Sequence, residues 1–246
     1  MATDYLMTQK GPRQAAALAV RLTVRKRTRS PVPAAIAGKA STIHLRAGQD
    51  AGLSFEGEEV VLIVRSGVLT MNVALPGRPR QAVALYFPDD AIWSRVAPIQ
   101  PATRLTAATE AELWRMRFSA FEELASRDPA AARFFQQSLA AQAARQALHS
   151  ATLSQLNGEE RVATFLVELA LRAGVKPSGG AAFDVPLSRK ELALYLGLNA
   201  DTLSRIMSRL RSTGIVGRAE RNRIVVRDVG ELMRLTPAAG AISEMI

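Results

Sequence analysis

Apolar and polar residues alternate in three different ways along the chain. Between Ile43 and about Phe118, short apolar runs of strand length are separated by turn residues. A long stretch rich in Ala, Leu and Gln follows, from Pro129 to about residue 156. Beyond it, apolar residues recur at intervals of three and four in shorter stretches, which is the spacing of helices. The pattern therefore predicts a β-rich unit, one long helix and a group of shorter helices.

The β-rich region contains strand-sized runs with Gly and Pro between them. These runs are Val60–Val64, Val68–Val73, Ala82–Phe87 and Ala111–Phe118. Short strands at this spacing are typical of a compact antiparallel roll or barrel. The glycines of the region indicate turns, because a strand followed by a glycine-rich loop and a helix is missing from the sequence. We therefore expect no phosphate-binding loop and no dinucleotide fingerprint.

Asp128 and Pro129 predict the start of the long helix, since Asp caps helices well and Pro is tolerated at the first helical position. A narrow stripe of mainly small residues then recurs every three or four positions. Small residues allow a second helix to approach closely, so we predict a dimer seam. The alternative is packing against the roll of the same chain. The predicted seam consists of Phe135, Leu139, Ala143, Ala147, Ser150 and Leu153.

The long helix is predicted to end before residue 157, where the pattern breaks and restarts. Asn157 can cap the next helix while Glu160, three residues later, completes a capping box. That helix is expected to bury Val162, Phe165 and Leu169 and to end near Gly174. A hinge and a domain boundary near residue 157 follow from this break.

Residues 187–216 carry the most informative pattern. Ser188 and Glu191 form a second capping box, which predicts a helix through Leu196. Gly197 supplies the backbone freedom of a tight turn, and Asn199 caps a further helix from residue 200 to about residue 212. Two short helices joined by a glycine-containing turn are typical of a helix-turn-helix. An amphipathic helix pair that serves protein contacts is the alternative.

The second of these helices is expected to contact DNA. Its apolar residues, Leu203, Ile206, Met207 and Leu210, lie on one face, and we predict that the opposite face meets the major groove. Residues near the N-terminus of such a helix contact bases, and these are Asp201, Ser204 and Arg205. A basic hairpin, or wing, is predicted around the strand at residues 224–226. The predicted phosphate contacts are Ser188, Arg189, Thr202, Ser208, Arg209, Arg211, Arg221 and Arg223.

Composition agrees with a nucleic-acid partner. The chain has 32 Lys and Arg against 22 Asp and Glu, a formal charge of +10, which favours nucleic acid ahead of an anionic membrane surface. It contains no Cys, which excludes disulfides, thiolate metal sites and Cys nucleophiles. It has neither an apolar run of the roughly 20 residues that span a bilayer nor a recognisable secretory signal. We therefore expect a cytoplasmic protein that makes no membrane contact.

The pattern divides the chain into five segments. Residues 1–40 are expected to form a mobile arm, because arginines crowd there and two prolines follow; the alternative is an arm that contacts phosphates. The predicted boundaries are 41–127 for a sensory β-roll, 128–156 for the dimerisation helix, 157–235 for a winged helix-turn-helix and 236–246 for a C-terminal tail.

Residues 187–226 closely resemble the winged helix-turn-helix of the cyclic-AMP receptor protein and FNR superfamily. The segments "RAGQDAG", "LIVRSGVLTM" and "ERVATFLVELA" are also similar to members of that family. The resemblance covers roughly residues 40–230. It implies an α+β fold with an N-terminal antiparallel β-roll like that of cyclic-nucleotide-binding domains, a long dimerisation helix and a C-terminal winged helix-turn-helix. It also implies a homodimer that binds a palindromic operator in double-stranded DNA and contacts RNA polymerase, without catalysis.

Within the family, FNR and FixK-type members have recognition helices that look like E-x-x-S-R and are associated with TTGA-type half-sites. Asp201, Ser204 and Arg205 occupy these three positions. Asp in place of Glu shortens the reach of the carboxylate by one methylene group.

The sensory half departs further from the family. In the family's cyclic-nucleotide cassette, a Gly-Glu pair binds the ribose, and an Arg followed by a hydroxyl residue binds the phosphate. This chain has Trp93-Ser94 at the first pair of positions and Pro101-Ala102 at the second. The N-terminal cysteines that hold an oxygen-sensing cluster in FNR proteins are missing. Haem sensing has only His44 and His149 as candidate histidine ligands. We therefore predict no cofactor and no cyclic-nucleotide control, with the effector unidentified. The alternative is a small-ligand-binding signalling module whose helix-turn-helix serves protein contacts.

Overall fold

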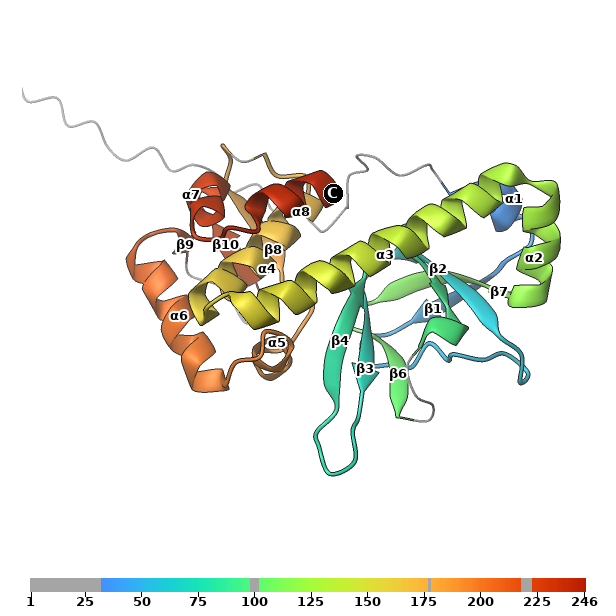
Figure 1. Ribbon diagram of the computed structural model, residues 1–246, viewed down its shortest axis with the longest axis horizontal. Helices are drawn as coiled ribbons and strands as arrows, with labels where there is room; N and C mark the ends of the chain where they lie inside the picture. Colours follow the sequence, from blue (N-terminus) through green and yellow to red (C-terminus); the bar gives the residue numbers. More distant parts are fainter. Residues whose placement is uncertain (1–31, 98–101, 177, 218–222) are drawn as a thin grey trace, which may run out of the picture.

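The computed structural model describes residues 32–97, 102–176, 178–217 and 223–246. The long helix α3 (Pro129–Gln155) runs diagonally across the molecule and joins a β-roll to a C-terminal unit of short helices and strands (Figure 1). This arrangement confirms the predicted α+β fold.

Two antiparallel sheets form the roll. One has the strand order β1-β7-β2-β5 and the other β4-β3-β6. Their bounds are β1 (Ser41–Leu45), β2 (Val60–Ser66), β3 (Leu69–Val73), β4 (Gln81–Tyr86), β5 (Ala91–Trp93), β6 (Thr103–Ala107) and β7 (Ala111–Arg117), and a 3₁₀ turn η1 (Ser94–Val96) follows β5. The strands expected near residues 60–64, 68–73, 82–87 and 111–118 are confirmed with small shifts at their ends. Strands β5 and β6 were not predicted.

Apolar side chains from both sheets fill the roll. Leu62 of β2, Leu69 of β3, Leu105 of β6 and Leu113 of β7 are all fully buried in one cluster, and burial of such side chains provides most of the stability of this unit. The turn between β2 and β3 requires Gly67, which has a φ of +79°. A Cβ atom there would lie 2.2 Å from the carbonyl oxygen of Glu110, too close for any other residue.

Three helices flank the roll. They are α1 (Ala34–Ala37), α2 (Phe118–Arg127) and α3. The side chain of Asp128 accepts a hydrogen bond of 2.9 Å from the backbone nitrogen of Ala130, which confirms the predicted start of the long helix. Helix α2 was not predicted; its Phe121 packs in one cluster with Ile36 of α1. The predicted N-terminal arm covers residues 1–40. Residues 1–31 lie outside the described part of the chain, and the described remainder of the arm contains α1.

One face of α3 is buried against the roll of its own chain. Ser138 accepts a hydrogen bond of 2.7 Å from the backbone nitrogen of Ala91, and Gln142 donates one of 2.6 Å to the carbonyl oxygen of the same residue. The helix is therefore fixed to β5 by both backbone groups of Ala91. The residues buried on this face are Ala131, Phe134, Ser138, Gln142 and Thr152.

The C-terminal unit begins directly after α3. Its elements are α4 (Gly158–Arg172), β8 (Ala181–Asp184), α5 (Arg189–Tyr195), α6 (Ala200–Ser212), β9 (Val216–Gly217), β10 (Arg223–Val226), α7 (Val229–Arg234) and α8 (Ala239–Met245). The three strands form one antiparallel sheet in the order β8-β10-β9. Its hydrophobic core continues into the roll, where Leu85 and Phe87 pack in the same cluster as Phe165 and Leu166 of α4. None of the described helices is long and apolar enough to cross a membrane.

Candidate DNA-binding surface

Both predicted capping boxes are present. Asn157 accepts hydrogen bonds from the backbone nitrogens of Glu159 and Glu160 at 3.0 and 3.1 Å, and Glu160 accepts one from the backbone nitrogen of Asn157. Ser188 and Glu191 make the equivalent exchange at the start of α5. The side chain of Asn199 accepts a hydrogen bond of 2.7 Å from the backbone nitrogen of Thr202, so α6 also begins at the predicted cap.

The turn between α5 and α6 is held against the start of α4. Gly197 has a φ of +62°, as the predicted tight turn requires, and a Cβ atom there would lie 3.1 Å from Nη1 of Arg161. Arg161 donates one hydrogen bond to the carbonyl oxygen of Leu156 at 2.8 Å and another to that of Leu196 at 3.2 Å. One guanidinium group thus connects the end of α3 with the helix-turn-helix.

Helix α6 has one apolar face and one polar face. Leu203, Ile206 and Leu210 are buried in the core, and Met207 is half-buried, as predicted. Asp201, Ser204 and Arg205 lie at helical spacing on the opposite face and are exposed. Within the part of the chain that the structure describes, these three side chains form no hydrogen bond or ion pair. The structure thus brings together the three residues of the predicted base-contact set.

The residues predicted to contact phosphates are placed less uniformly. Arg209 forms an ion pair of 2.7 Å with Glu159 of α4, and Arg211 donates a hydrogen bond of 2.9 Å to the hydroxyl group of Ser208. The hydroxyl group of Ser188 is occupied as a helix cap, whereas Arg189 is exposed. Thr202 and Arg223 are half-buried, and Arg221 lies outside the described residues. The whole set stays a prediction.

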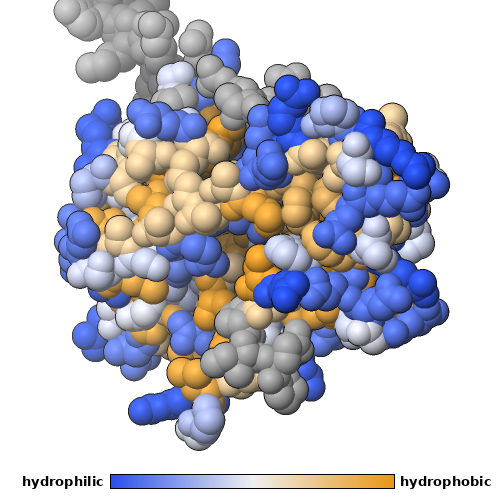
Figure 2. Space-filling model, turned by 45° about the vertical axis from the view of Figure 1, so that its right-hand side comes forward, coloured by the Kyte–Doolittle hydropathy of each residue, from blue (hydrophilic) through white to orange (hydrophobic). Residues whose placement is uncertain are grey.

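The predicted dimer seam lies beside the buried face of α3. Ala143, Ala147 and Ser150 are exposed, and Leu139 and Leu153 are half-buried. Phe135 is also half-buried, with its ring centroid 4.6 Å from that of Phe121, so it takes part in packing within the chain. An apolar band crosses the face of the molecule in Figure 2, in the direction that α3 takes in Figure 1.

Trp93 and Ser94, the first pair at the cassette positions, are used inside the roll. The Trp93 indole nitrogen donates a hydrogen bond of 3.1 Å to Glu59, and its ring stacks on Phe118 with centroids 4.5 Å apart. The hydroxyl group of Ser94 is buried and accepts a hydrogen bond of 2.9 Å from the backbone nitrogen of Val60. Both side chains therefore stabilise the fold itself.

The second pair offers no cation for a phosphate. Pro101 lies outside the described residues, and the carbonyl oxygen of Ala102 accepts a hydrogen bond from Arg80. The two nearby arginines form exposed ion pairs, Arg95 with Glu59 at 3.6 Å and Arg104 with Asp50 at 3.9 Å.

The two histidines lie in different environments. His44 is exposed on β1, whereas His149 of α3 stacks on Tyr195 of α5 with ring centroids 4.2 Å apart. Burial lowers the pKa of His149, an effect that Glu168 partly offsets, so the neutral imidazole is favoured. Among the described residues, no group of three or more His, Asp and Glu is placed to hold a metal ion.

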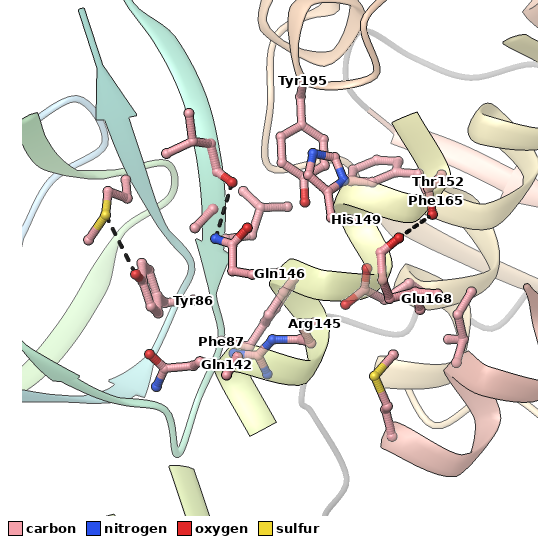
Figure 3. A pocket seen from close by; sticks show the side chains of 18 of the residues that line it. Tyr86, Phe87, Gln142, Arg145, Gln146, His149, Thr152, Phe165, Glu168 and Tyr195 are labelled. Atoms are coloured by element: carbon pink, nitrogen blue, oxygen red, sulfur yellow. Dashed lines mark hydrogen bonds between the residues drawn. The ribbon is translucent and has the colours of Figure 1, made fainter. Parts of the chain in front are cut away.

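A cavity of about 500 Å³, which the sequence does not indicate, lies between the roll and the C-terminal unit. Figure 3 shows its labelled side chains arriving from β4, α3, α4 and α5. Only the juxtaposition of these elements creates it, and no local motif marks its residues.

A roll, a long connecting helix and a helix-turn-helix with an exposed second helix define a DNA-binding transcription regulator. Residues 160–235 match the Crp-like helix-turn-helix domain. The chain is 32% identical over 180 residues to a probable transcriptional activator of Rhizobium leguminosarum bv. viciae, covering 71% of this chain and 72% of that protein. Together with the fold, this similarity shows that the chain belongs to the Crp/Fnr superfamily, whose members regulate transcription and are not enzymes.

Two further comparisons agree. The transcriptional activator protein FnrL of Cereibacter sphaeroides is 30% identical over 194 residues, which cover 76% of this chain and 77% of that protein. The structure of FixK2 from Bradyrhizobium japonicum matches with a TM-score of 0.68 and 28% identity, over 81% of this chain and 98% of that one.

Proposed function

We propose that the protein is a homodimeric, sequence-specific regulator that recognises a palindromic operator with TTGA-type half-sites. The observation that carries this proposal is the set of three exposed side chains without internal partners, Asp201, Ser204 and Arg205, in the N-terminal half of α6. Side chains at this end of a recognition helix contact base edges when the helix enters the major groove.

Each of the three residues suits a contact of this kind. A guanidinium group such as that of Arg205 donates two hydrogen bonds to O6 and N7 of guanine, the commonest specific contact to DNA. The carboxylate of Asp201 accepts from the amino group of cytosine, and the hydroxyl group of Ser204 suits several base edges. Because Asp is one methylene group shorter than Glu, its contact requires the helix to lie deeper in the groove.

The homodimer is supported by the second face of α3. The buried face is fixed to the roll through Ala91. In the neighbouring stripe, Ala143 and Ala147 are exposed and Leu139 is half-buried. Small residues there allow close approach of an identical helix, as in a coiled coil. Two-fold symmetry would present two copies of α6 to a palindromic site, with RNA polymerase contacted from the bound dimer.

We further propose that operator binding does not depend on a cyclic nucleotide. Trp93 and Ser94 are engaged by Glu59 and Val60, and Ala102 offers no charge. A phosphate group buried in the roll without an Arg partner would be an unpaired charge in a region of low dielectric constant, which is strongly unfavourable.

Selection from a random DNA library with the full-length protein tests this function. The expected result is enrichment of a palindrome, which then binds in a gel shift against unlabelled random competitor. The matched control is the selected site with the base sequence of each half-site written in reverse order. This control is expected to compete no better than random DNA. If no sequence is enriched and all fragments bind alike, the proposed specificity is wrong and the helix-turn-helix serves another partner.

A further inference from the structure

The 500 Å³ cavity lies where five elements of the molecule meet. Strand β4 of the roll forms one wall, α3 crosses it, and α4, α5 and α8 of the C-terminal unit form the others. Leu139 and Ala143 of the predicted seam also line it, so a second α3 packed there would cover its outer side. A volume of this size accommodates a small organic molecule.

Its walls are mostly apolar and aromatic. Leu85 of β4 and Phe87, which directly follows this strand, pack in one cluster with Phe165 of α4. Ile242 and Met245 of α8 border the same space. Pockets for small molecules combine such surfaces with a few polar groups that fix the orientation of the ligand.

Unpaired polar groups line this cavity. The hydroxyl group of Tyr195 and the ring nitrogens of His149 have no hydrogen-bond partner among the described residues, although the two rings stack on one another. Figure 3 shows the Tyr195 hydroxyl group and the His149 ring on the same side of the cavity, facing the region of Gln146 and Glu168. Hydrogen-bonding groups left open in this way suit a polar ligand.

Positive charge exceeds negative charge around the cavity. Arg145 pairs with the fully buried Asp90 at 2.6 Å through Nη2, while its Nη1 is shielded from solvent and has no hydrogen-bond partner. Arg161, which also lines the cavity, donates only to carbonyl oxygens. Glu168 is paired with Arg172. Of these charged side chains, Arg145, Arg161 and Glu168 line the cavity, and Asp90 and Arg172 lie behind them as ion-pair partners. Within the described residues these five groups are three guanidinium groups and two carboxylates, an excess of one positive charge that favours an anion.

The cavity is separate from the cassette positions of the roll. Neither Trp93 and Ser94 nor Ala102 lines it, and the first two are engaged elsewhere. The cavity instead borders the helix-turn-helix directly, because Tyr195 and Leu196 at the end of α5 form part of its wall. A hydrogen bond of 2.8 Å from Gln81 of β4 to the carbonyl oxygen of Leu194 holds the two sides together beside it.

We propose that this cavity is the effector site, and that it binds a small carboxylate with an aromatic body. The aromatic body would lie among Phe87, Phe165 and the His149–Tyr195 stack, and the carboxylate would accept hydrogen bonds from Arg145, after a small shift of its side chain, and from the Tyr195 hydroxyl group. Since the walls come from both the roll and the helix-turn-helix, occupancy changes how α5 and α6 are held and therefore changes operator affinity. The effect on DNA rests on the proposed function.

Calorimetric titration of the full-length protein with 2-naphthoate and its uncharged analogue 2-naphthamide tests the site. The expected result is saturable binding of 2-naphthoate at least tenfold tighter than that of the amide. Met245→Trp, which fills the cavity from α8, is expected to weaken naphthoate binding at least tenfold. Met233→Trp is the matched control, because Met233 is half-buried on α7 and does not line the cavity; its affinity is expected to stay within twofold. Equal affinity for both probes, or full binding by Met245→Trp, would overturn the site.

Substitution of Arg145 tests the charge. Arg145→Met is expected to abolish the preference for naphthoate over naphthamide, and Arg145→Lys to retain part of it. If Arg145→Met does not fold, because the buried Asp90 loses its ion pair with Arg145, the Lys variant and Met245→Trp still decide the question. An unchanged preference in the Lys and Met variants would contradict the proposal.

Operator binding is measured separately with and without saturating 2-naphthoate. A change of at least fivefold in operator affinity, lost in Met245→Trp, supports an effector site. Specific operator binding that naphthoate leaves unchanged overturns the effector proposal and leaves the proposed DNA-binding function intact. Naphthoate binding in a protein that recognises no operator would overturn the proposed DNA-binding function and leave the ligand site intact. The two failures are therefore distinguishable.

Discussion

The recognition helix α6 and the cassette positions of the roll differ in whether their polar side chains have partners within the chain. On α6, Asp201 and Arg205 are exposed and have no partner within the described residues. In the roll, Trp93 is bound to Glu59 and Ser94 to the backbone of Val60. A side chain that its own fold leaves without a partner is available to another molecule, whereas one that is satisfied internally contributes to stability. The contrast is between a helix whose polar side chains are open to another molecule and a position in the roll whose polar side chains stabilise the fold.

The local structure explains the difference. The apolar side chains of α6 are confined to one face, so Leu203, Ile206 and Leu210 anchor the helix without using its polar residues. At the end of β5 the large Trp93 ring stacks on Phe118.

The largest effect is expected from Leu139→Glu, because the proposed operator recognition requires two copies of α6 held by the predicted seam. A glutamate there would bury its charge against its symmetry mate with no partner, which is strongly unfavourable. We expect loss of the dimer in analytical ultracentrifugation and loss of operator binding with it. Gln137→Glu adds the same charge on an exposed part of α3 away from the seam and is expected to stay dimeric. A dimeric Leu139→Glu variant would place the interface elsewhere.

Arg205→Ala tests whether α6 contacts bases. It is expected to cost about 1–3 kcal/mol of binding free energy on the operator and to relax the preference at one base pair, because a bidentate contact to guanine is lost. Arg205→Lys keeps the charge and is expected to restore affinity for random DNA but not the base preference. Gel shifts on the operator and its single-base variants give both quantities. Equal losses on operator and random DNA would show that Arg205 contacts only phosphate.

Arg211→Ala is expected to have a smaller and less specific effect. Loss of one phosphate contact should weaken binding to all sequences and reduce the salt dependence, the slope of log K against log salt concentration, by about one unit. Arg209→Ala should change the slope less, since Arg209 must first leave Glu159. Fluorescence anisotropy over a salt series measures these slopes. An altered base preference with an unchanged slope would assign Arg211 to the bases.

Cyclic AMP and cyclic GMP are expected to have no effect on operator affinity. This prediction tests the cassette positions of the roll. Trp93, Ser94 and Ala102 cannot replace the groups that hold a nucleotide, so operator affinity should be the same with either nucleotide at saturating concentration. Titration calorimetry and operator binding measure this directly. Micromolar binding that also shifted operator affinity would contradict the proposal and point to Arg95 or Arg104 as the partner of the phosphate.

The helix-turn-helix could be predicted from the sequence almost residue by residue. Its boundaries depend on local interactions: the caps at Ser188 and Asn199 and the turn at Gly197 each involve residues within a few positions of one another. The exposure of the residues predicted to contact bases also followed from the faces of α6, because the spacing of apolar residues in a helix fixes which side is buried.

The parts that could not be predicted depend on distant contacts. Strand β5 has only three residues, and β6 has alternating exposed positions with few large apolar side chains, so neither gives a strong local pattern. Helix α2 has no side-chain cap at Arg117 and fully buries only Phe121. The cavity combines residues of β4, α3, α4, α5 and α8, and no property of any one segment indicates it.

The hydrophobic cluster that joins Leu85 and Phe87 of the roll to Phe165 and Leu166 of α4 has a consequence for folding cooperativity. Although the chain divides into a roll and a C-terminal unit along its sequence, the two share one core at their junction. Neither can lose its packing without exposing apolar surface of the other, so opening of the junction is coupled to the global unfolding of both. A substitution in this shared core would therefore lower the stability of the DNA-binding unit and the roll together, even though it touches neither the operator nor the seam.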